Sequence, residues 1–201
     1  MKQMIKDAVV LFVITLVAGL MLGGIYQITK EPIARQEKLA KEAASKEVFA
    51  NADSFEAIDV VEVKASDYEN ANISGAAVNE VLKALSKDGE LLGYVITVSS
   101  QEGYGGTIQF SMGVALDGTV NGISILSISE TAGLGMNAEK VLKPQFAGVN
   151  TDTFTYTKTG STRAGELDAI SGATITTKAF TNAANAGLYY YNNVLGGGNN
   201  E

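Results

Sequence analysis

From Ala8 to Thr29 the chain has 22 consecutive residues without a charged side chain, rich in Val, Leu and Ile. A helix of that length, at about 1.5 Å per residue, spans about 33 Å, enough to cross the hydrocarbon core of a bilayer. A cleaved secretory signal is the alternative, but the stretch is long and contains Ile25-Tyr26-Gln27-Ile28 where a small-x-small cleavage site would stand. We therefore expect residues 1–30 to form a single transmembrane anchor.

Charges beside this segment leave its orientation open. More basic residues follow the span than precede it, which by counting places the large domain in the cytoplasm, although long domains cross membranes largely regardless of such charges. The basic residues are Lys2 and Lys6 before the span and Lys30, Arg35, Lys38 and Lys41 after it. Gly19 and Gly23 form a GxxxG pair on which another helix could pack closely, although glycine is common in membrane helices generally.

Composition narrows the chemistry of the remaining chain. The length of 201 residues, 46% of them hydrophobic, fits one globular domain and an appendage. Cys, His and Trp are absent from the sequence, which removes the usual ligands of iron–sulfur clusters, haem and zinc and the usual base of a nucleophilic triad. We expect no metal site and no catalytic residue. Beyond residue 30 the net charge is −9, so nucleic acid is a poor partner.

Patterns along the chain predict an α+β fold with a mostly antiparallel sheet packed against helices. Residues 31–60 read as a helical stalk and linker with Pro32 in its first turn, residues 61–195 as the domain, and residues 196–201 as a disordered tail. From Ser74 onward, the spacing of Val78, Val81, Leu82 and Leu85 predicts a short helix that ends near Asp88-Gly89.

Three strands follow that segment, at Leu91–Ser99, Thr107–Val114 and Val120–Ile128. The second strand alternates strictly, and Asp117-Gly118 gives a hairpin signal before the third. Next come a loop at Thr131–Gly135, a short helix at Ala138–Leu142 and another alternating stretch at Thr153–Thr157. A final helix, Ile175–Leu195, has a stripe that would pack on the sheet, formed by Ile175, Ala179, Ala183, Ala186 and Tyr190.

The segment Asp168–Thr174, DAISGAT, precedes this final helix. Ser171 is a natural N-cap, and Thr174 would lie in the first turn, where free N–H groups and the helix dipole favour an anion. A phosphate ester on Thr174 would be stabilised there. The alternative is that Ser171 only caps the helix and Thr174 only packs.

DAISGAT matches the acceptor pattern Asp-x-x-Ser/Thr-Gly-Ala-Thr of FMN-binding domains that a dedicated flavin transferase modifies on threonine. GYGGTI at Gly103–Ile108 resembles the glycine-rich segment of those domains, and ETAGLG at Glu130–Gly135 resembles their Glu-Thr-x-Gly-Leu/Ile-Gly loop. With the anchor, the chain is similar from end to end to the RnfG family of Rnf electron transport complexes, whose sister family is the NqrC family of the sodium-pumping NADH:quinone reductase. A length near 200 residues favours the former.

The resemblance implies FMN joined through its phosphate to Thr174, in a domain on the extracytoplasmic side of the cell (inner) membrane, which decides the orientation against the lysine count. It also implies a redox subunit, not catalytic alone, of an ion-translocating ferredoxin:NAD oxidoreductase. Its partners would be the integral and peripheral subunits of the complex, membrane lipid and, during maturation, the flavin transferase.

Residue roles follow from the same resemblance. Asp168 would be recognised by the transferase, while Ser171 and Gly172, with Ala173 beside them, would donate to the phosphate. The other expected contacts are Glu130 and Thr131 with the flavin or its ribityl chain, Leu134 with a ring face, and Lys158 with the pyrimidine edge. Glu130 as a solvated loop acid and Lys158 as an exposed strand-end lysine are the alternatives.

Two segments differ from known motifs, one from the loop of the FMN-binding domains and one from the dinucleotide-binding fingerprint. Ala132 stands where the family loop often has Pro. The glycines of GYGGTI form no dinucleotide fingerprint, so we interpret them as a tight turn near the cofactor.

A pilin-like surface protein is a second hypothesis for the function. The sequence lacks the glutamate expected early in the apolar helix and the Gly-Phe-type processing site of such proteins.

Overall fold

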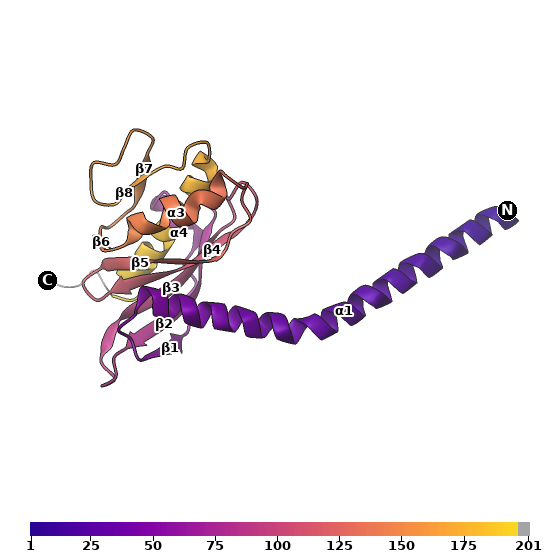
Figure 1. Cartoon of the computed structure of the whole chain (residues 1–201), viewed down its shortest axis with the longest axis horizontal. Helices are drawn as coiled ribbons and strands as arrows, with labels where there is room; N and C mark the ends of the chain where they lie inside the picture. The colour runs from indigo at the N-terminus through magenta and orange to yellow at the C-terminus, as the bar shows by residue number, and fades with distance from the viewer. Residues whose placement is uncertain (197–201) are drawn as a thin grey trace. The chain divides into compact units, whose positions relative to one another are not determined.

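The structure, a computed structural model, describes residues 1–196 (Figure 1). Contacts divide the chain into two units, residues 1–40 and the chain from Lys41 onward. Residues 197–201 of the expected tail lie outside the described residues. The limits 1–30, 31–60 and 61–195 remain predictions.

Helix α1, Lys2–Val48, contains the apolar segment of the first unit. Its most apolar 18-residue window has a mean hydropathy of 2.6 and is not buried, so the helix is long and apolar enough to cross a membrane. Pro32 lies inside this helix. The first-turn position predicted for Pro32 is therefore wrong, because the residues of the predicted stalk up to Val48 continue the apolar helix. The proline nitrogen costs α1 one hydrogen bond without ending it.

A six-stranded antiparallel sheet forms the centre of the second unit, with its strands in sequence order. Its strands are β1 (Ser54–Ile58), β2 (Ala76–Leu85), β3 (Leu91–Ser100), β4 (Ile108–Ala115), β5 (Thr119–Ser127) and β6 (Val149–Asn150). The three predicted strands and the hairpin after Ala115 are confirmed. Ile108, Phe110, Met112 and Val114 share one fully buried face of β4, as their alternation predicted.

The helix predicted from Ser74 is wrong, because these residues form β2. A bulge between Val78 and Glu80 adds one residue, so Val78 and Val81 pack on the same face although they are three positions apart. Leu82 packs on the opposite face, which is also covered. A bulged strand buried on both sides thus reproduced the spacing of a helix.

Helix α4, Thr174–Asn193, packs on one face of the sheet, where the Phe110 and Phe180 rings stack with centroids 5.2 Å apart (Figure 1). The end of α1 packs on the other face through Val48 and Phe49. Gly113 makes this packing possible, because a Cβ there would lie 2.9 Å from both the Val48 Cβ and its carbonyl oxygen. Residues 41–58 therefore pack with the sheet.

The remaining elements lie between β1 and β2, between β5 and β6, and between β6 and α4. They are α2 (Ala65–Asn70), the 3₁₀ turns η1 (Gly135–Asn137) and η2 (Lys143–Phe146), α3 (Ala138–Val141), β7 (Thr155–Thr157) and β8 (Glu166–Asp168). β7 and β8 pair in parallel, and the five residues after β8 lead directly into α4. The final helix is confirmed, although Ile175 of its predicted stripe is more than half exposed.

Candidate functional site

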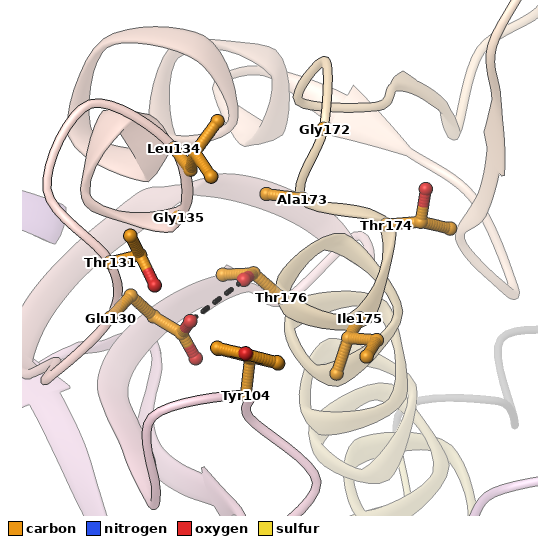
Figure 2. Close-up of a pocket in the computed structure, with 10 residues that line it drawn as sticks. All are labelled: Tyr104, Glu130, Thr131, Leu134, Gly135, Gly172, Ala173, Thr174, Ile175 and Thr176. Carbon is orange, nitrogen blue, oxygen red and sulfur yellow. Dashed lines mark hydrogen bonds between the residues drawn. The ribbon is translucent and has the colours of Figure 1, made fainter.

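A pocket of about 480 Å³ opens at the start of α4 (Figure 2). Three segments that are distant in sequence form its walls: the β3–β4 loop, the segment after β5, and the chain that enters α4. The lining residues are Tyr104, Glu130, Thr131, Leu134, Gly135, Gly172, Ala173, Thr174, Ile175 and Thr176. The volume lies within the range of about 300–1,000 Å³ that is usual for cofactor sites.

Glu130 links the three walls. Its Oε2 accepts a hydrogen bond from the Thr176 hydroxyl at 3.0 Å, drawn in Figure 2, and its Oε1 accepts one from the Gly105 N–H at 3.3 Å. Charge-assisted hydrogen bonds of this kind are stronger than neutral ones. Both carboxylate oxygens are thus engaged by the protein, so Glu130 is neither a solvated loop acid nor a side chain left entirely to a ligand.

Glycines surround this carboxylate because the backbones approach too closely for a side chain. A Cβ on Gly105 would lie 1.9 Å from the Ser129 carbonyl oxygen, and one on Gly135 would lie 2.7 Å from the Thr176 Oγ1. The glycines of the GYGGTI and ETAGLG segments therefore fix the distance between the walls. The interpretation of Gly103–Gly106 as a tight turn fits this geometry, since a Cβ on Gly103 would lie 2.2 Å from the Gly106 carbonyl oxygen.

The turn that enters α4 differs from the one predicted. Ala173, with φ −131° and ψ 52°, occupies the N-cap position, and no side chain caps the helix there. Ser171 is exposed and one residue before Gly172, whose φ of +75° makes the turn. The prediction that Ser171 is the N-cap is wrong. Thr177 secures the turn instead: its hydroxyl accepts from the Ile170 N–H at 3.1 Å and donates to the Ala173 carbonyl at 3.0 Å.

Three threonines lie in the first turn of α4, and their hydroxyls differ in availability. Thr176 and Thr177 are 1% and 0% exposed, and both hydroxyls donate to protein acceptors. Thr174 is only partly buried, its side chain points away from Glu130 in Figure 2, and its hydroxyl has no hydrogen bond to any residue in 1–196. Within this turn, Thr174 is the hydroxyl that a reagent can reach.

The backbone of the same turn provides hydrogen-bond donors. The N–H groups of Thr174, Ile175 and Thr176 have no protein acceptor among residues 1–196, as expected for the first turn of a helix. Together with the helix dipole they favour an anion. Among the lining residues only Glu130 is charged, so the helix terminus supplies the positive potential.

Beside the anion site the pocket offers apolar surface. Tyr104, Ile175 and Leu134 are 71%, 52% and 41% exposed, and all three line the pocket. Hydrogen-bonding groups and apolar side chains at one site suit a ligand with a phosphate and a flat apolar ring system, because ring faces need apolar cover and ring edges need polar partners. The residues present therefore fit FMN.

Most of the predicted site residues meet in this pocket. Thr174, Gly172, Ala173, Glu130, Thr131 and Leu134 line it, whereas Ser171, Lys158 and Asp168 do not. The Asp168 carboxylate accepts from the Ser161 N–H, and the Asp168 N–H donates to the Gln145 Oε1 at 2.7 Å. Lys158 is exposed in the loop between β7 and β8.

Four lining residues were not predicted: Tyr104, Gly135, Ile175 and Thr176. Tyr104 belongs to the GYGGTI segment, of which only the glycines are interpreted, as a tight turn. Gly135 ends the ETAGLG segment, in which roles are predicted for Glu130, Thr131 and Leu134. Thr176 contacts Glu130 across 46 positions of sequence, a pairing that local patterns do not reveal.

A second polar cluster supports the β3–β4 loop from behind. Glu102 accepts a hydrogen bond from the Asn182 amide at 3.2 Å and pairs with Lys178 at 3.2 Å. A hydrogen bond from Ser74, with the Lys178 and Asn182 contacts, holds the pKa of the Glu102 carboxyl below its ordinary value. The loop that carries Tyr104 is thereby tied to α4 on both sides.

Comparison with known proteins agrees with this site. Residues 103–189, which include every pocket residue, match the FMN-binding domain family, and residues 1–48 match the RnfG N-terminal region. The chain is similar to the subunit designated G in the Na(+)-translocating ferredoxin:NAD(+) oxidoreductase complex of Acetobacterium woodii, with 32% identity over 96% of this chain and 94% of that one.

It is also similar to the subunit with the same designation in the proton-translocating ferredoxin:NAD(+) oxidoreductase complex of Clostridium ljungdahlii, with 31% identity over 90% of this chain and 88% of that one. Among solved structures, the subunit designated C in the Na(+)-translocating NADH-quinone reductase from Parabacteroides distasonis superposes with a TM-score of 0.49 at 22% identity, over 70% of this chain and 76% of that one. Identity above 30% along almost the whole length of the Acetobacterium and Clostridium proteins shows that this chain belongs to the RnfG family of ion-translocating (Rnf) oxidoreductase complexes and contains an FMN-binding domain.

Proposed function

We propose that this protein carries FMN joined by a phosphoester to the Thr174 Oγ1 and relays electrons within an ion-translocating ferredoxin:NAD oxidoreductase complex. The observation that carries the proposal is the pairing of one reachable hydroxyl with the unpaired N–H groups of the first turn of α4, at the edge of an apolar pocket within residues 1–196. FMN, when bound, supplies one- and two-electron transfer; the chain has no His or Cys to add a proton donor of near-neutral pKa.

The protein's own residues hold and shield the group. The Thr174 oxygen forms the covalent link, and the N–H groups at the start of α4, with Gly172 beside them, bind the phosphate. Glu130 keeps the three walls together, while Thr131 is placed to meet a polar edge and Leu134 and Ile175 to cover apolar surface. Asp168 and Ser171 lie outside the pocket lining, where a flavin transferase would recognise them. Lys158, exposed between β7 and β8, would act on the flavin only if that loop approached it.

The proposal includes a place in the cell. The apolar part of α1 spans the cell membrane in contact with lipid and with the membrane subunits of the complex, and the domain lies on the extracytoplasmic side. Free FMN is scarce there, so a covalent link prevents loss of the cofactor. The coupling ion is left open, since one relative is named as translocating Na(+) and another as translocating protons.

Expression of the full chain in a host that contains the flavin transferase tests the covalent link. We expect an intact mass increased by FMN less one water, and yellow-green fluorescence that persists in a denaturing gel. Thr174→Ala should abolish both signals, whereas Thr155→Ala, which removes an exposed hydroxyl of β7 outside the pocket, should keep them. Unmodified wild-type protein, or a Thr174→Ala protein that still carries flavin, contradicts the proposal.

Because the sequence contains no cysteine, a single introduced thiol reports the location of the domain without background. Lys87→Cys lies in the exposed turn between β2 and β3. A membrane-impermeant maleimide should label it in intact cells (for a two-membrane host, spheroplasts), while Lys2→Cys, before the apolar segment, should be labelled only after lysis. The reverse pattern would place the domain in the cytoplasm.

A further inference from the structure

We propose that Tyr104 is the aromatic wall of the pocket and lies against one face of the flavin ring system, with Glu130 as the positioning residue that holds its loop. This inference rests on the proposed function and adds to it a residue that the sequence did not indicate. Figure 2 shows Tyr104 between the Glu130 carboxylate and the Ile175 side chain.

The Tyr104 side chain is exposed without a partner. The residue is 71% exposed, and within residues 1–196 its ring packs against no other aromatic ring and its hydroxyl makes no hydrogen bond. Four other tyrosines of the domain pair with one another: Tyr94 with Tyr191, and Tyr68 with Tyr189. A large aromatic surface left open beside a pocket gains free energy when a ligand covers it.

The backbone that carries Tyr104 is fixed. The next residue donates its N–H to Glu130, and a Cβ on either neighbouring glycine would collide with backbone oxygen, of Gly106 for Gly103 and of Ser129 for Gly105. The loop is also held through Glu102, which contacts Lys178 and Asn182 of α4. A loop whose backbone is held in this way is preorganised, so little backbone entropy is lost when a ligand covers the ring.

The exposed aromatic and apolar side chains of the pocket suit a flat ring system as the occupant. Thr174 and Tyr104 line the same pocket, and Ile175, the residue after Thr174, offers a second apolar surface there. Aromatic rings stack in offset or edge-to-face contacts worth about 0.5–1.5 kcal/mol beyond their area, which favours a conjugated ring over an aliphatic chain. A group tethered at Thr174 can therefore rest its ring against Tyr104.

The test uses the flavin-loaded full chain and variants at this position. Tyrosine in contact with a flavin quenches its emission, whereas phenylalanine shields the ring but does not quench it. We expect Tyr104→Ala to raise both the emission per covalent flavin and its quenching by iodide several-fold. Tyr104→Phe should raise the emission but leave iodide quenching as in wild type. Tyr156→Ala, a tyrosine in β7 outside the pocket lining, is the matched control and should change neither quantity.

The outcomes separate this inference from the proposed function. Wild-type protein without flavin overturns the function. Full flavin content with emission and iodide quenching equal to wild type in Tyr104→Ala and Tyr104→Phe overturns the role of Tyr104 alone. If Tyr104→Ala receives no flavin, Tyr104→Phe provides the test. Flavin emission equal to wild type in Tyr104→Phe would contradict contact between Tyr104 and the flavin.

Glu130 is tested on the chain before modification. In Thr174→Ala protein, we expect slow hydrogen exchange at the Gly105 amide, and several-fold faster exchange when Glu130→Gln weakens its acceptor. In the flavin-loaded protein the same variant should raise emission, as loss of Tyr104 does. Unchanged exchange at Gly105 would show that Glu130 does not hold the loop.

Discussion

The two ends of α4 are built in opposite ways. At its start, Thr174 and Ile175 are accessible and the backbone N–H groups lack protein acceptors among residues 1–196. At its other end, Tyr190 and Tyr191 are each 1% exposed; the Tyr190 hydroxyl accepts from the Val61 N–H at 2.9 Å, and the Tyr191 hydroxyl donates to the Leu116 carbonyl at 2.8 Å. The same helix thus provides a site at one end and an anchor at the other.

The difference shows where binding capacity lies in this domain. Hydrogen-bonding groups that are satisfied within the fold contribute stability, while those left unsatisfied at the surface are available to a ligand. Substitutions near the end of α4 should therefore lower the unfolding free energy, whereas substitutions of the accessible residues at its start should impair flavin attachment and leave the unfolding free energy almost unchanged.

Tyr190→Ala should have the largest effect on stability. It removes a buried ring and the acceptor for Val61, and large-to-small changes of this kind cost about 3–5 kcal/mol. The free energy of unfolding, measured by urea denaturation of the unmodified protein, gives the value. A loss under about 1 kcal/mol would show that the far end of α4 is not the anchor.

Thr177→Val should have an intermediate effect on stability and should also affect flavin attachment. The substitution keeps the side-chain shape but leaves the buried Ile170 N–H without its acceptor, which costs about 1–3 kcal/mol. It should also slow flavin attachment, because the turn that presents Thr174 loosens. Thr181→Val, whose hydroxyl only donates to the Thr177 carbonyl, is the control and should attach flavin at the wild-type rate.

A smaller effect on stability is expected for Glu102, which contacts Lys178 and Asn182 in the middle of α4, and it should appear in the dependence of stability on pH. The Glu102 pKa is lowered in the folded state, so its contribution is present above the ordinary value near 4.5 and is lost as the pH falls through the folded-state pKa. Thermal unfolding between pH 3 and 6, a range of about three units chosen around that value, should show a steeper decline for wild type than for Glu102→Gln. Parallel curves would mean that Glu102 does not tie the loop to α4.

Thr174→Ala should have the smallest effect on stability although it should abolish the proposed flavin attachment. Its hydroxyl makes no hydrogen bond within residues 1–196, and surface substitutions of this kind change the unfolding free energy by about 0.5 kcal/mol or less. Urea denaturation of unmodified wild type and variant should give the same midpoint. A clear destabilisation would show that Thr174 packs as a structural residue.

Local patterns were sufficient where one periodicity governs one face. The alternation from Ile108 to Val114 predicted the buried face of β4, and the small residues of α4 predicted the helix on the sheet. They failed at β2, because the bulge at Val78–Glu80 and burial on both faces imitate helical spacing.

The site was predictable in its motifs but not in its internal contacts. The segments at Gly103, Glu130 and Asp168 are separated by tens of residues, so the meeting of Glu130 with Gly105 and Thr176 follows only from the folded chain. Ser171 looked like the N-cap because its residue type favours that position, but the positive φ of Gly172 ends the turn later.

The engagement of Thr176 and Thr177 has a consequence for the order of events in biogenesis. An unfolded chain offers three hydroxyls within four positions, at Thr174, Thr176 and Thr177. The folded domain offers one of them, since the other two are buried and donate to protein acceptors. If FMN is attached as proposed, attachment after folding would be confined to Thr174, whereas on the unfolded polypeptide only recognition by the transferase would distinguish the three hydroxyls.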